Sequence, residues 1–137
     1  MTRWIPMLAV GLAILAATAE AHHAIAAIYD SSKRITIDGT VVEFQFISPH
    51  PILIVEVVGG NGRREAWRLE MDNRGELSAV GMRSETLKKG DRVVVTGGVA
   101  RDQSRALYIR RLERPADGFW YEQVGSSPTV GGLRSAR

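Results

Sequence analysis

Three histidines are the residues of this chain best suited to bind a metal ion. His22 and His23 are adjacent near the N-terminal end, and His50 stands between Pro49 and Pro51. If the chain is cleaved before His22, that residue offers its α-amine and its ring Nδ1 to one metal as a chelate. A second imidazole then completes a T-shaped set of nitrogen donors, a histidine brace, which favours Cu(II) among divalent first-row metals. The sequence therefore predicts copper as the metal and His22 and His50 as ligands, with His23 as a fallback.

The same histidines also have a structural interpretation. His22 and His23 fit a solvated chain terminus, since terminal residues are usually exposed. His50 fits a turn residue whose ring hydrogen-bonds a backbone carbonyl. The flanking prolines restrict its backbone in either case, which would limit the entropy lost on metal binding. Both interpretations remain open from the sequence.

The first 21 residues have the features of a cleavable export signal. Arg3 supplies a positive charge, and residues 4–17 form an apolar run shorter than the ~20 residues that span a bilayer. Ala19 and Ala21 place small residues at the −3 and −1 positions of a cleavage site. We therefore predict a signal peptide over 1–21, a periplasmic or secreted protein, and no stable membrane span after cleavage. A retained N-terminal anchor is the alternative.

Composition narrows the functional classes. The formal net charge is only +3, and the chain contains no cysteine, so thiolate metal sites and cysteine nucleophiles are excluded. Mild basicity is typical of ordinary solubility charge. Export removes nucleic acid as a partner, and few aromatic residues are available to stack on bases. No Ser-His-Asp set, phosphate loop or paired-carboxylate motif is recognisable, so the sequence favours a non-catalytic protein.

The hydrophobic pattern predicts an all-β fold. Two β-branched, aromatic-rich runs flank the corner at His50, and turn signals recur along the chain. Asn73 and Glu76 have the spacing of a capping box that opens a short helix ending near Gly81. Strand, strand, strand, short helix, strand, strand is the order of a small five-stranded OB-like antiparallel barrel, with an open antiparallel sandwich as the alternative. The predicted domain covers 22–114, and 115–137 is predicted to be a C-terminal tail, partly disordered.

The first strand cannot be straight. Ile35 and Ile37 lie on one face, whereas Val42 and Phe44 lie on the other, because side chains alternate along a strand. A β-bulge reconciles the two sets, and the sequence places it near Gly39.

A second hypothesis is a binding or adaptor barrel for an envelope protein, peptide or oligosaccharide. Its candidate contact residues are Trp67, Arg68 and Glu70, with Arg110 on the same type of face. Trp67 alternates with Leu69, which favours a core position for the indole. Asp30 or Glu70 is also a candidate oxygen ligand for a metal.

The chain is similar to a family of short exported bacterial proteins of unknown function. The resemblance covers about residues 21–112 and implies an exported β-barrel but no activity. The usual glycine turn after the family's fourth strand is replaced here by Asp102-Gln103-Ser104. The resemblance rests on His22-His23, Tyr29-Asp30, Ser48-Pro49-His50, the strand from Trp67 to Glu70, a short helix running into Gly81, and Leu87, Gly90 and Asp91.

Overall fold

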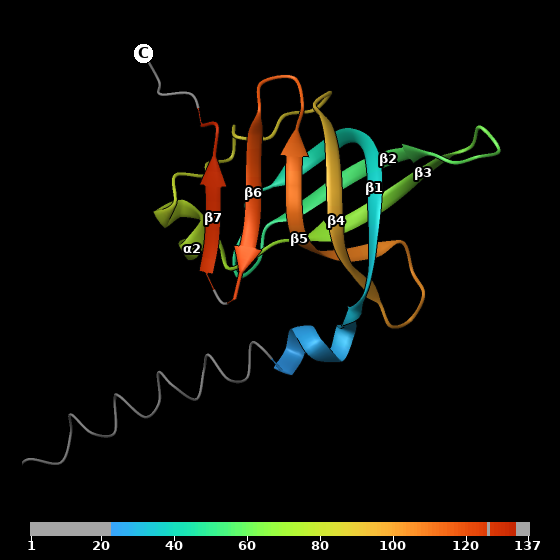
Figure 1. The fold of residues 1–137 in the computed structure, drawn as a ribbon, viewed down its shortest axis with the longest axis horizontal. Helices are drawn as coiled ribbons and strands as arrows, with labels where there is room; N and C mark the ends of the chain where they lie inside the picture. The colour runs from blue at the N-terminus through green and yellow to red at the C-terminus, as the bar shows by residue number, and fades with distance from the viewer. Residues whose placement is uncertain (1–22, 126, 134–137) are drawn as a thin grey trace, which may run out of the picture.

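A long first strand, β1, pairs with β2 on one side and with β4 on the other (Figure 1). The computed structural model describes residues 23–125 and 127–133, which contain seven strands and two short helices. The first helix covers 23–28 and is followed directly by β1. The other elements are β1 (Tyr29–Gln45), β2 (Ile52–Val58), β3 (Arg64–Glu70), α2 (Arg74–Ala79), β4 (Arg92–Ala100), β5 (Ala106–Arg114), β6 (Phe119–Val124) and β7 (Ser127–Gly131).

All strands belong to one sheet with the order β3-β2-β1-β4-β5-β6-β7. Neighbouring strands in this order are antiparallel. A further parallel pairing joins β3 to β5, with Leu69 opposite Leu107. The all-β prediction is confirmed, as is a short helix between the third and fourth strands.

The predicted count of five strands is too low. Residues 115–137, expected to be a partly disordered tail, contain β6 and β7, and β6 pairs with β5. Phe119 and Tyr121 of β6 are fully buried, so hydrophobic burial holds this segment against the rest of the sheet. The Gly, Pro and Ser content around the strand obscured its short alternating pattern.

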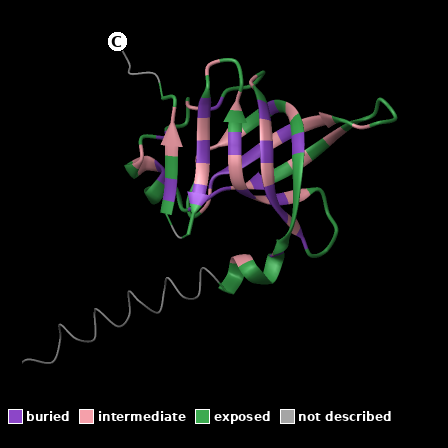
Figure 2. Ribbon diagram, in the orientation of Figure 1, coloured by how far each residue is buried: buried purple, intermediate pink, exposed green. Residues whose placement is uncertain are grey.

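Every strand contributes at least one buried side chain, as do α2 and the loop that follows it, and in β7 the buried residue is Pro128. Figure 2 shows buried positions alternating with half-buried or exposed ones along several strands. Helix α2 begins after Asn73, whose Oδ1 accepts a hydrogen bond from Gly75 N at 2.8 Å, and it buries Leu77 in the core. Within the described residues, neither helix reaches the length and apolar character that a membrane span requires.

The bulge in β1 lies further along the strand than predicted. Pairing with β2 shifts register between Val41 and Glu43, so Val42 is the extra residue. Ile37 and Val41 are buried before the shift and Phe44 is half-buried after it, which resolves the change of face. Gly39 has a different role: a Cβ there would lie 2.5 Å from both Glu56 O and Val55 Cγ1.

The turn between β4 and β5 contains no glycine, although a glycine is usual at this turn in the similar family. Gln103 has φ 63°, the only positive φ at a non-glycine residue among those described. Asp102 Oδ1 accepts a hydrogen bond from Ser104 N at 2.9 Å and stabilises the turn.

We expect Gly39→Ala to lower the free energy of unfolding by about 1–3 kcal/mol, because the added methyl group collides with the backbone of β2. Gly60→Ala is the matched control, since no atom lies within 4 Å of the added Cβ, and its effect should stay within about 0.5 kcal/mol. Urea unfolding measures both. Equal stability of the two variants would contradict close strand approach at Gly39.

Candidate functional site

All three tyrosines of the chain donate their phenol hydrogens to two carboxylates. Tyr29 Oη donates to Glu70 Oε2 at 2.8 Å. Tyr108 Oη donates to Asp72 Oδ1 at 2.9 Å, and Tyr121 Oη donates to Asp72 Oδ2 at 2.6 Å. The two carboxylates stand at the end of β3 and just beyond it, and the tyrosines come from β1, β5 and β6.

Asp72 is the centre of this polar cluster. Asp72 is only 4% exposed. In addition to the two tyrosines, Gln123 Nε2 donates a third hydrogen bond to its carboxylate. Burial of a carboxylate is tolerated only when hydrogen bonds replace its hydration. The amide of Gln123, itself buried, uses its oxygen to accept from Arg110 Nη1 at 2.5 Å. A continuous chain of hydrogen bonds therefore runs from Asp72 through Gln123 to Arg110.

The environment of the tyrosines keeps them protonated. Burial is the largest cause that raises the pKa of each phenol. The negative charge of Asp72 raises the pKa of Tyr108 and Tyr121 further, and the hydrogen bond to Glu70 does so for Tyr29. The phenols therefore act as hydrogen-bond donors in the folded protein throughout the neutral range.

A cavity of about 190 Å³ opens beside this cluster. The helix over 23–28 forms one side of it, and the backbone of that helix is attached to the β4–β5 connection by Arg101. Arg101 N donates to Ile28 O and Arg101 Nε donates to Ala26 O, each at 2.9 Å. The cavity is lined by Ile25, Ala26, Tyr29, Ser31, Gly98, Arg101, Tyr108, Arg110, Gln123 and Gly125.

His50 lies next to the polar cluster. Its Nδ1 is 2.8 Å from Met71 O, so this nitrogen carries the hydrogen and donates it. Its ring meets Tyr108 edge-on, with 6.5 Å between ring centroids. The sequence interpretation of a ring bonded to a carbonyl is thus correct for Nδ1. Nε2 has no hydrogen-bond partner within residues 23–125 and 127–133.

Of the other two predicted metal ligands, the structure describes only His23. His22 lies outside the described residues. His23 is exposed in the helix over 23–28. No group of three or more His, Asp or Glu side chains with a metal-binding arrangement occurs among the described residues. Of the three histidines, the described residues show one, His50, whose ring is oriented by a hydrogen bond.

The predicted binding residues on β3 make different contacts. Glu70 accepts from Tyr29 and lies 3.6 Å from Arg68 Nη1. Trp67 packs against the core and has a buried Nε1 with no partner among the described residues. It also lines a surface groove of about 490 Å³ with Lys33 and Val99. Glu70 contacts Tyr29 and His50 contacts Tyr108, whereas Trp67 lies in a separate groove.

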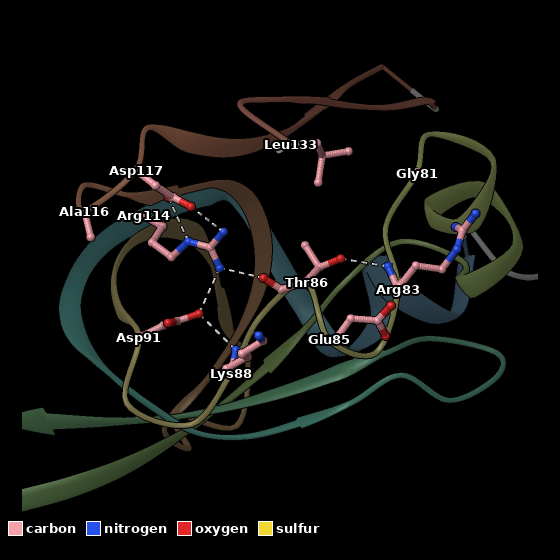
Figure 3. Close-up of a pocket in the computed structure, with 10 residues that line it drawn as sticks. All are labelled: Gly81, Arg83, Glu85, Thr86, Lys88, Asp91, Arg114, Ala116, Asp117 and Leu133. Carbon is pink, nitrogen blue, oxygen red and sulfur yellow. Dashed lines mark hydrogen bonds and ion pairs between the residues drawn. The ribbon is translucent and has the colours of Figure 1, made fainter. Parts of the chain in front are cut away.

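A hollow of about 720 Å³ surrounds Arg114, whose guanidinium already makes several contacts (Figure 3). Arg114 donates to both oxygens of Asp117, to Asp91 Oδ2 at 2.9 Å and to Thr86 O at 2.5 Å. Its guanidinium also lies over the ring of Phe119. These contacts attach the loop before β4 to the β5–β6 turn, which is a structural role.

The sequence interpretation missed Asp72, Tyr108, Tyr121 and Gln123. Gln123 alternates with Phe119 and Tyr121 and so falls on the buried face of β6. A glutamine on a buried face needs a polar partner, and this was the available signal. The partner itself, Asp72, is 51 residues away in sequence, so no local pattern could identify it.

Comparison with protein families gives one finding. The family described as "Family of unknown function (DUF6152)" matches residues 9–108. Neither the curated proteins nor the solved structures contain a match to the chain.

We expect Asp72→Ala to lower the free energy of unfolding by about 3–5 kcal/mol, because Tyr121 and Gln123 would keep buried donors without an acceptor. Asp38→Ala is the control. Asp38 pairs with Arg92 on the surface, where both side chains are more than half exposed, so its loss should cost less than about 1 kcal/mol. Chemical unfolding distinguishes the two. Equal costs would show that the buried cluster adds nothing to stability.

The raised tyrosine pKa values also predict an alkaline loss of stability. Phenols in the unfolded chain ionise near pH ~10, whereas the folded ones ionise at higher pH. The unfolded state thus releases protons first, and the free energy of unfolding falls as pH rises above ~10. Tyr108→Phe should make this decline shallower. Urea unfolding at several alkaline pH values measures it, and identical slopes for both proteins would contradict the burial argument.

Proposed function

We propose that this chain, which belongs to the DUF6152 family of unknown function, is an exported metal-binding module without catalysis of its own. Copper is the favoured metal. The proposed ligands are His50 and the N-terminal His22 exposed by removal of residues 1–21, with His23 as the fallback.

The orientation of His50 is the observation that carries the proposal. Donation from Nδ1 to Met71 O fixes the ring and its tautomer and leaves the lone pair on Nε2. Metal-binding histidines commonly donate their other ring nitrogen to a carbonyl or carboxylate in this way, which orients the ring and raises its basicity. Half-burial of His50 and the flanking prolines limit its motion further.

The position of the helix over 23–28 supports His22 as the second ligand of the proposed copper site. Ile25 and Ala26 line the same cavity as Tyr108, and Tyr108 also meets the ring of His50. The helix over 23–28 and the turn that contains His50 therefore both lie near Tyr108. A mature N-terminus at His22 would begin one residue before this helix, which favours a short path from its amine to the His50 end of the domain.

An OB-like scaffold is part of the proposal. The pairings β1–β2, β2–β3, β3–β5, β5–β4 and β4–β1 form a closed circuit. Helix α2 follows β3 in the chain. This connectivity is typical of OB-like barrels, and such a circuit would hold the His50 corner rigidly.

We expect the exported protein to begin at His22 and to bind one Cu(II) per chain. His22→Ala and His50→Ala should each weaken binding by roughly a hundredfold or more, because each removes a donor from the metal rather than an outer contact worth ~10–100-fold. Intact mass fixes the first residue and the stoichiometry, and competition with a copper chelator gives the affinity.

His23→Ala is the matched control and should retain one tight copper. Cleavage at another position, or copper affinity unchanged in His50→Ala, would overturn the proposal. Loss of binding in His23→Ala alone would replace His22 by His23 in the ligand set.

A further inference from the structure

We propose that the cavity beneath the first helix binds the carboxylate of a small organic acid through Arg110. None of the copper ligands proposed above lines this cavity, so the inference is independent of the metal.

Arg110 is the extra residue of a β-bulge. Along the β4–β5 pairing, Thr96 is opposite Arg111 and Gly97 is opposite Ile109, which leaves Arg110 without a partner on β4. Bulges redirect a side chain relative to the regular alternation of a strand and are frequent beside binding sites. The bulge is consistent with a half-buried Arg110 whose side chain lines the cavity.

The guanidinium of Arg110 is held in place but not neutralised. Gln123 Oε1 accepts from Nη1, and Asp72 in turn fixes the amide of Gln123. No carboxylate forms an ion pair with Arg110 among residues 23–125 and 127–133. Its remaining N–H groups make no hydrogen bond within that part of the chain. A half-buried cation without a counter-ion is unfavourable, and a guanidinium binds a carboxylate through two parallel hydrogen bonds.

The other charged groups around the cavity already have partners. Arg101 at its edge lies 3.7 Å from Asp30 Oδ2 and donates to Ala26 O. The negative charge of Asp72 is surrounded by its own donors, Tyr108, Tyr121 and Gln123. Glu70 accepts from Tyr29 and faces Arg68. Of the two arginines that line the cavity, Arg110 is therefore the one without an ion-pair partner among residues 23–125 and 127–133.

The size and walls of the cavity define the rest of the ligand. A volume of about 190 Å³ corresponds to about six water molecules at liquid density, which is below the range of drug-sized ligand sites. The rings of Tyr29 and Tyr108, 5.7 Å apart between centroids, form an aromatic wall together with the apolar side chain of Ile25. A compact acid with one apolar or aromatic body fits this combination.

Benzoate and benzamide form a matched pair of probes, because they share a ring and differ in charge. We expect benzoate, added to metal-free protein, to shift the backbone NMR signals of Gly98, Arg110 and Gln123 in a saturable manner. Benzamide should bind at least tenfold more weakly. Inorganic phosphate, tested in the same way, reports whether any anion suffices, and binding as tight as that of benzoate would overturn the assignment to an organic acid.

Variants separate the arginine from the general charge of the protein. Arg110→Gln should weaken benzoate binding at least tenfold, and Arg110→Lys should retain part of it. Arg63→Gln makes the same charge change at an exposed hairpin position and should leave affinity unchanged. Circular dichroism checks that each variant is folded. The comparison of benzoate with benzamide is made on the unmodified protein, so it tests the proposal even if a variant does not fold.

Absence of saturable shifts at the cavity residues, equal affinity for benzoate and benzamide, or unchanged affinity in folded Arg110→Gln would each overturn the proposal. None of these results bears on copper binding by His22 and His50, so failure of one site is distinguishable from failure of the other.

Discussion

The buried carboxylate of Asp72 is the constraint on which the rest of this structure depends. It stands just after β3, yet its hydrogen-bond donors come from β5 and β6. Charge burial of this kind is tolerable only when every donor is in position. The segment after residue 114 is therefore integral to the domain, because without Tyr121 and Gln123 the carboxylate would lose two of its three partners.

The hydrogen bonds of Asp72 also connect it to two partly exposed side chains. Through Tyr108 it borders the ring of His50, whose Nδ1 is fixed by a backbone carbonyl adjacent to Asp72. Through Gln123 it fixes the guanidinium of Arg110 at a bulge in β5. Two groups suited to recognition thus share one rigid support: an oriented imidazole, and a guanidinium that has no ion pair within the described part of the chain. Side chains held by packing and buried hydrogen bonds lose little entropy when a ligand binds.

Placing these groups also requires close approach of strands. Gly39 lets β2 come near β1, and at Gly97 a Cβ would lie 2.5 Å from Tyr108 O. The second glycine is next to the bulge that contains Arg110. A larger residue there would push β5 outward and move Tyr108 and Arg110 together. Backbone proximity and the polar cluster are therefore parts of one arrangement rather than separate features.

The sequence by itself determined what depends on local pattern. Alternating apolar residues indicated strands, Asn73 indicated the start of α2, and the conflict of faces in β1 required a bulge. The position of that bulge at Val42, the strands β6 and β7, and the partners of Asp72 were decided only by the tertiary structure. Pairing register and burial join residues far apart in the chain, such as Asp72 and Gln123, and short-range periodicity carries no information about such distant partners. His50 was identified from its residue type, but only its contact with Met71 O determined which ring nitrogen remains available.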